Sequence, residues 1–140
     1  MMLRQKRPTE IKVIGIVALI IGILNFLVGL VLVTSFVSLS DLGVDVSGLE
    51  PETLDIIALG AGIFHLVMAA YCVFTYLSTL WRFKWAWISN MALSMIIYGM
   101  GFFAFQGGNY IDGTIDAVLS TVITSLMYTE PVKQYLKKVD

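Results

Sequence analysis

Apolar residues are concentrated in four long segments of the chain, which lie at about residues 11–39, 54–80, 85–105 and 111–129. A helix that crosses a bilayer needs about 20 consecutive, mostly apolar residues. The first two segments exceed this length, and the third reaches it with aromatic residues at both ends. The fourth is interrupted by Asp112 and Asp116 but contains no proline. We therefore predict an all-α fold in which residues 1–140 form a single membrane domain, a bundle of four transmembrane helices.

The pattern changes at Pro131, close to the end of the sequence. Because proline lacks an N–H group and clashes with the preceding turn of a helix, Pro131 is predicted to end the fourth span. Beyond it, apolar and basic residues fall on opposite faces of a helix: Val132, Tyr135, Leu136 and Val139 on one, and Lys133, Lys137 and Lys138 on the other. We expect residues 131–140 to form a short amphipathic helix on the cytoplasmic surface of the membrane.

Basic residues set the expected orientation of the chain. All nine fall on one side of the predicted membrane: Arg4, Lys6, Arg7, Lys12, Arg82, Lys84, Lys133, Lys137 and Lys138. Cytoplasmic loops carry an excess of Lys and Arg, so this partition predicts an even number of spans, with both termini in the cytoplasm and the protein in the cell membrane. The basic N-terminus resembles a signal peptide, but the apolar run behind it is longer than the ~7–15 residues of such a peptide, and we expect a retained helix.

Composition supports a lipid environment and limits the chemistry. Hydrophobic residues make up 58% of the chain and charged residues 14%, whereas soluble domains carry about 25% charged residues. The single cysteine and single histidine exclude an intramolecular disulfide, a cysteine-based metal site and any site that needs two imidazoles. We expect no cofactor, no metal and no nucleic-acid partner. The expected partners are the lipid bilayer with its anionic cytoplasmic leaflet and either a second copy or a membrane-complex subunit.

An aromatic and basic cluster precedes the third predicted span. It consists of Trp81, Arg82, Lys84, Trp85 and Trp87, and it contains every tryptophan of the chain. Tryptophan rings favour the headgroup level of a bilayer, so the cluster is interpreted first as an aromatic belt at the inner interface. A specific site for an anionic lipid is the sharper alternative.

Small residues form a regular stripe in the first predicted span, where Gly15, Gly22 and Gly29 are seven residues apart. Small residues let helix backbones approach closely in a bilayer, where hydrophobicity itself does not drive helices together. The seven-residue interval favours a left-handed crossing of about 20°. The stripe is therefore expected to face a neighbouring helix.

One polar side chain per span is expected at a similar depth: Asn25, His65, Tyr98 and Asp116. Counted from the inner edge at about 1.5 Å per residue, three of them lie about 20–22 Å up and Tyr98 about 18 Å up. Polar groups turn away from hydrocarbon, so these four should face the interior, with His65 in hydrogen-bonding reach of Asn25 or Asp116. They either bind one another and fix the pairing of the helices, or His65 and Asp116 bind a proton or cation.

Two short motifs carry a resemblance to a known group of proteins. Residues 7–11, Arg-Pro-Thr-Glu-Ile, open the first span, and residues 131–135, Pro-Val-Lys-Gln-Tyr, close the chain. This arrangement resembles small prokaryotic, particularly archaeal, four-helix membrane proteins of unknown function, which begin R-P-x-x-[IV] and end near P-x-V-K-x-[YF]. In this chain Pro131 stands directly before Val132, one place later than the proline of that pattern. The resemblance implies the topology and transfers no catalytic residue or substrate.

The sequence favours a non-catalytic integral membrane protein that acts by helix–helix association, as a homo-oligomer or as an accessory subunit of a membrane complex. A small transporter or channel that uses His65 and Asp116 is the alternative. An enzyme is disfavoured because no Ser/His/Asp or Cys/His arrangement is evident, and a lone His65–Asp116 pair lacks a nucleophile.

Overall fold

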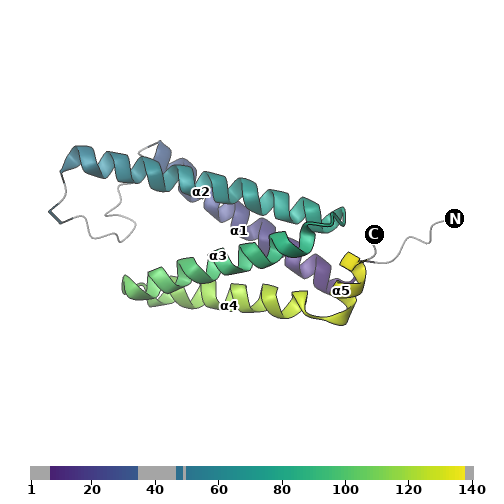
Figure 1. Cartoon of the computed structure of the whole chain (residues 1–140). Helices are drawn as coiled ribbons and strands as arrows, with labels where there is room; N and C mark the ends of the chain where they lie inside the picture. Colours follow the sequence, from purple (N-terminus) through teal and green to yellow (C-terminus); the bar gives the residue numbers. More distant parts are fainter. Residues whose placement is uncertain (1–6, 35–46, 49, 138–140) are drawn as a thin grey trace. The chain divides into compact units, whose positions relative to one another are not determined.

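The computed structural model describes residues 7–34, 47–48 and 50–137. The regular secondary structure of this part of the chain is entirely helical, as predicted (Figure 1). Its helices are α1 (Thr9–Val33), α2 (Pro51–Leu80), α3 (Ala86–Gln106), α4 (Tyr110–Met127) and α5 (Glu130–Lys137). Each predicted span overlaps one of the first four helices. The end of the first predicted span, beyond residue 34, and residues 138–140 of the predicted amphipathic helix lie outside the described residues.

Three of these helices, α1, α2 and α3, are long and apolar enough to cross a membrane. In their most apolar windows only 28%, 22% and 33% of the residues, respectively, are buried within the protein. Large apolar side chains cover the rest of their surface, including Ile16, Leu24, Phe64 and Val67. Soluble monomers rarely expose continuous apolar surface on this scale. The exposed faces are thus those expected of helices surrounded by lipid.

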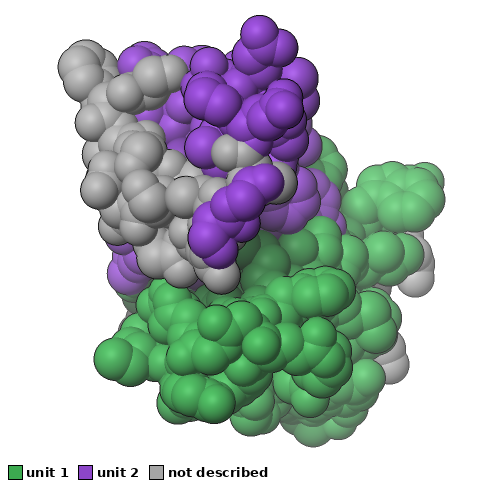
Figure 2. Space-filling view, turned by 90° about the vertical axis from the view of Figure 1, so that its left-hand side faces the viewer, with its two compact units in different colours: residues 1–19, 74–140 green, residues 20–73 purple. Residues whose placement is uncertain are grey.

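The chain divides into two compact units, which Figure 2 shows in different colours. One unit comprises residues 1–19 and 74–140, and the other comprises residues 20–73. The boundaries fall inside α1 and α2, so each of these helices contributes to both units.

In the unit of residues 20–73, α1 and α2 meet along the glycine stripe. An added Cβ at Gly29 would lie 2.9 Å from the carbonyl oxygen of Gly62, and one at Gly22 would lie 3.0 Å from Cβ of Cys72. Carbon atoms do not approach a backbone oxygen or another Cβ this closely without displacement, so both positions need glycine for the helices to pack. Gly15, in the other unit, faces the ring of Tyr76, which would lie 3.2 Å from a Cβ added at that glycine.

In the other unit, α3 and α4 run side by side (Figure 1). An added Cβ at Gly101 would lie 3.1 Å from the Gly113 carbonyl oxygen, so the two backbones nearly touch. Leu93, Ile123 and Met127 are fully buried. The connection is tight because Gly108 adopts a positive φ of 81°, a conformation that glycine adopts without strain.

The start of α4 is capped by Asn109, whose side-chain oxygen accepts a hydrogen bond from the backbone N–H of Asp112 at 3.3 Å. Asn109 also donates to the Asp112 carboxylate at 2.5 Å. An Asn N-cap and an acidic residue in the first turn both stabilise the N-terminus of a helix. Asp112 is therefore exposed at the helix end rather than turned toward the interior.

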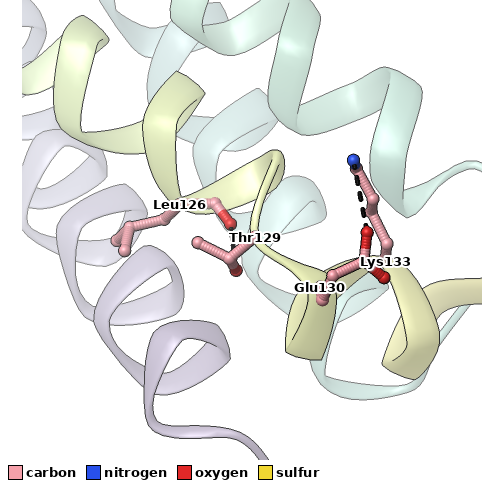
Figure 3. A network of polar contacts seen from close by, with 4 residues as sticks. All are labelled: Leu126, Thr129, Glu130 and Lys133. Atoms are coloured by element: carbon pink, nitrogen blue, oxygen red, sulfur yellow. Dashed lines mark hydrogen bonds and ion pairs between the residues drawn. The ribbon is translucent and has the colours of Figure 1, made fainter.

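Figure 3 shows the turn between α4 and α5, where the structure corrects one prediction. The helix α4 already ends at Met127, and the Thr129 hydroxyl donates to the Leu126 carbonyl at 2.8 Å. Pro131 lies in the first turn of α5, where its missing N–H is not required, so it begins the next helix instead of ending the fourth span. Lys133 and Glu130 form an ion pair of 3.8 Å across that first turn.

The amphipathic helix predicted for the membrane surface is present as α5, but part of its apolar face packs against the protein. Val132 is 0% exposed and Tyr135 is 4% exposed. Since α5 follows α4 after a two-residue connection, its apolar face folds back onto the same unit.

Candidate functional site

The most polar contact within the unit of residues 20–73 joins His65 on α2 to Asn25 on α1. His65 Nδ1 lies 2.7 Å from Asn25 Oδ1, and Asn25 Nδ2 donates to the Ile21 carbonyl at 2.9 Å. Because the amide nitrogen is used as a donor, Oδ1 is the acceptor, and His65 Nδ1 must carry the proton. In a neutral ring with this tautomer, the lone pair lies on Nε2. The expected contact between His65 and Asn25 is present.

The other two residues of the predicted polar layer, Tyr98 and Asp116, belong to the other unit. Asp116 is half-buried, and its Cβ lies 2.8 Å from the position of an added Cβ on Gly101. Tyr98 differs from the expectation, because its side chain is 61% exposed. Ile97 occupies the inward position instead and is 3% exposed, and the next residue of a helix points about 100° away. A single layer of all four polar groups stays a prediction.

Three hydroxyl groups join α3 to α4 near the middle of both helices. Ser94 Oγ lies 2.9 Å from Ser120 Oγ and 2.6 Å from Thr124 Oγ1. The Ser120 hydroxyl also lies 2.9 Å from the Ser94 carbonyl, and the Ser94 hydroxyl lies 2.9 Å from the Ser120 carbonyl. The buried hydroxyls therefore all have partners, which a low-dielectric environment requires.

A groove of about 360 Å³ lies beside these hydroxyls on the outer surface of α3 and α4. Six of the residues that line it carry hydroxyl groups: Ser94, Tyr98, Ser120, Thr121, Thr124 and Ser125. Thr121 donates to the Ala117 carbonyl at 2.7 Å. The hydroxyls of Tyr98 and Ser125 have no hydrogen-bond partner among the described residues. The polar surface of α4 thus extends beyond its contact with α3.

A second buried polar cluster links the end of α2 to the start of α3, and no sequence motif marks it. Thr75 Oγ1 and Ser89 Oγ are 2.7 Å apart, and Asn90 Nδ2 lies 2.6 Å from Thr79 Oγ1. Thr75 and Thr79 lie in a largely apolar stretch of α2 that also contains Ser78, so hydropathy alone did not single them out. The cluster holds the two helices together at this end.

The aromatic and basic cluster centres on Arg82, two residues after the end of α2. Its φ of 57° is the one positive value among the described residues other than glycine. Phe83 N–H donates to the Ser78 carbonyl at 2.9 Å, which is the hydrogen bond of a Schellman helix end. Arg82 Nε donates to the Tyr135 carbonyl of α5 at 2.9 Å, and the guanidinium carbon lies 4.5 Å from the centre of the Tyr135 ring. Arg82 therefore joins the α2–α3 turn to α5.

The remaining residues of this cluster face outward. Trp81, Trp85 and Trp87 are 61%, 57% and 37% exposed. Lys84 Nζ lies 5.9 Å from the centre of the Trp85 ring. Exposed indole rings beside cations suit the headgroup region of a bilayer.

Known proteins give no further guide to the site. Comparisons with protein-family models, curated proteins and solved structures find no match. Among the described residues, no group of three His, Cys, Asp or Glu side chains could hold a metal ion.

Proposed function

We propose that this protein is a four-span integral protein of the cell membrane, with both termini in the cytoplasm, that acts without catalysis by associating with a second copy of itself. The observation that carries the association is the hydroxyl-lined groove on the outer surface of α3 and α4. The topology and the association are supported separately.

The proposal that α4 crosses the membrane rests on its length, its packing and the distribution of charge. Its 18 residues extend about 27 Å at 1.5 Å per residue, close to the ~30 Å of the hydrocarbon core. It packs along α3, and Asp112 lies in its first turn, where a carboxylate reaches the headgroups. If α4 did not cross, the C-terminal lysines would lie on the opposite side from the other basic residues.

The groove favours association because hydroxyl groups in hydrocarbon need hydrogen-bond partners. An unpaired polar group in an apolar environment costs about 1–3 kcal/mol judged from mutations in proteins. Tyr98 and Ser125 offer such hydroxyls on an otherwise apolar surface and have no partner among the described residues. A neighbouring helix with its own polar groups would supply partners that lipid chains cannot.

A second copy is the partner that this surface fits best. A two-fold interface uses the same surface on both subunits, so that surface must carry both a recess and a projection. The groove is the recess, and Met95 and Tyr98, which are 73% and 61% exposed at its edge, are the projections. Tyr98 of each copy would place its hydroxyl near the groove hydroxyls of the other.

The test is the mass of the protein in mild detergent, measured by size-exclusion chromatography with light scattering. We expect a homo-oligomer for the native chain and a several-fold weaker association for Thr121→Leu, which fills the groove. Val118→Leu is the matched control, because Val118 is exposed on α4 outside the groove, and it should leave the mass unchanged. The proposal would be contradicted if the native chain were a monomer, or if Thr121→Leu and Val118→Leu weakened the association equally. Co-purification of a different protein in fixed stoichiometry would assign the groove to that subunit.

A second candidate function is the transport of protons or cations through His65 and Asp116. The observation that favours it is the Asn25–His65 contact, which leaves Nε2 of a half-exposed imidazole free to take up a proton. In liposomes, His65→Gln and Asp116→Asn should then abolish pH-dependent flux. Asp112→Asn, at the capped end of α4, should leave the flux intact. The absence of flux in the native protein would remove this candidate.

A further inference from the structure

Arg82 carries a positive charge that no carboxylate of the described chain neutralises. The single ion pair of the described residues joins Lys133 to Glu130. Arg82 uses Nε for the Tyr135 carbonyl, a neutral acceptor, and its Nη2 is buried without a hydrogen-bond partner in this part of the chain. A half-buried guanidinium with unused donors is an incomplete arrangement, because buried donors are normally paired.

The backbone at Arg82 adopts a conformation that glycine would normally take. In a Schellman helix end, the first residue beyond the helix cap adopts the left-handed backbone conformation. Glycine is favoured there because it has no Cβ. Arg82 occupies that position with a φ of 57°. The contact with Tyr135 holds its guanidinium plane in one orientation, 4.5 Å from the ring centre. A strained backbone that carries an oriented, unpaired cation is typical of a binding site.

The surroundings of Arg82 suit the headgroup of a lipid. Trp81, Phe83 and Trp85 are 61%, 45% and 57% exposed, and they project next to the ends of two helices that are long and apolar enough to span a membrane. Lys84 lies beside Trp85 and adds a second cation without a carboxylate partner among the described residues. A phosphate would meet two positive charges, and the acyl chains would meet exposed aromatic and aliphatic side chains.

We infer that Arg82 and Lys84, flanked by Trp81 and Trp85, form a binding site for the phosphate of an anionic phospholipid. The phosphate accepts from guanidinium N–H groups other than those of Nε, which Tyr135 occupies, and of the buried Nη2, and Lys84 contributes as a point charge. The site goes beyond general attraction to the cytoplasmic leaflet, because it depends on the orientation of Arg82 by α5. It is independent of association through the α3–α4 groove.

Tryptophan fluorescence tests the inference directly, because the three tryptophans of the chain all belong to this cluster. The protein is placed in phosphatidylcholine vesicles that contain equal mole fractions of either brominated phosphatidylglycerol or brominated phosphatidylcholine, whose bromine atoms quench nearby indoles. We expect stronger quenching by the phosphatidylglycerol, and Arg82→Gln should lower that preference about fivefold, the effect of one cation near an anionic surface. Equal quenching by the two lipids in the native protein would overturn the inference.

Matched variants separate a site from general charge attraction. Lys12→Gln removes one exposed cation from the same predicted side of the membrane and should leave the lipid preference unchanged. Lys84→Gln changes an exposed side chain outside the packing of α5 and should lower the preference about twofold even if Arg82→Gln undocks α5. The site would be overturned if Lys12→Gln lowered the lipid preference as much as Arg82→Gln does. It would also be overturned if neither Lys84→Gln nor Arg82→Gln changed that preference. Displacement by excess inorganic phosphate would assign it to a free anion instead of a lipid.

Discussion

Replacement of Gly29 by alanine should destabilise the contact between α1 and α2. The new Cβ would lie 2.9 Å from the backbone oxygen of Gly62 and 2.9 Å from Cγ of Leu66. Leu66 can change its rotamer, but the oxygen belongs to the backbone of α2, so the helices must separate. Overpacking of this kind costs about 1–3 kcal/mol.

Gly60→Ala provides a matched control on the partner helix. No atom lies within 4 Å of a Cβ added at Gly60, so the alanine there meets open space. Both substitutions replace a glycine inside a helix and gain a similar helix propensity, about 1 kcal/mol. The difference between the two variants therefore isolates the packing cost, and Gly29→Ala should be about 1–3 kcal/mol less stable than Gly60→Ala.

The free energy of unfolding can be measured by titrating the purified protein from mild detergent into sodium dodecyl sulfate while circular dichroism follows the helices. The native chain and both variants are compared at the same detergent mole fractions. Equal stabilities of Gly29→Ala and Gly60→Ala would show that the glycine stripe does not face a neighbouring helix. The assignment of Gly22 and Gly29 to the α1–α2 contact would then be wrong.

Two further substitutions test the polar contacts in the same titration. Asn25→Ala leaves the Nδ1–H of His65 without its acceptor and should cost about 0.6 kcal/mol, up to ~1.7, whereas Asn25→Asp keeps an acceptor and should restore the hydrogen bond; equal losses would refute the pairing. Ser94→Ala removes the central hydroxyl between α3 and α4 and should cost about 0.6 kcal/mol, up to ~1.7, since interhelical hydrogen bonds in membranes are weak. Ser125→Ala, in the open groove, should have no effect on a monomer, and a loss as large as that of Ser94→Ala would contradict the hydrogen-bond assignment.

Hydropathy and periodicity anticipate the helices and one of their contacts. Each of the five predicted helical segments overlaps a helix, and in the first four this follows because long apolar runs have few alternatives to helix formation. The glycine spacing of α1 also anticipates its contact with α2, since only the absence of a side chain permits that approach. Asn25 and His65 could be paired because each is an isolated polar residue on the small-residue face of its helix.

Other features depend on shape and could not be derived from polarity. The packed face of α4 includes Ile123 and Met127, both fully buried, and leaves Thr121 exposed, because a threonine can satisfy its hydroxyl within its own helix. Tyr98 is outside because Ile97, whose side chain is wholly apolar, occupies the neighbouring inward position. The docking of α5 on Arg82 requires a left-handed residue that sequence patterns assign to glycine.

The side of the membrane on which each loop lies is the most direct test of the central claim, that four helices cross the bilayer with both termini in the cytoplasm. Single cysteines can be placed at Gln5, Phe83, Lys138 and Ser47, since Cys72 is buried and protected from reagents. In intact cells, an impermeant maleimide should label the cysteine at Ser47 and none of the other three, which should react only after the membrane is opened. Labelling of the Lys138 position from outside would mean that α4 does not cross the membrane, and would contradict the four-span account.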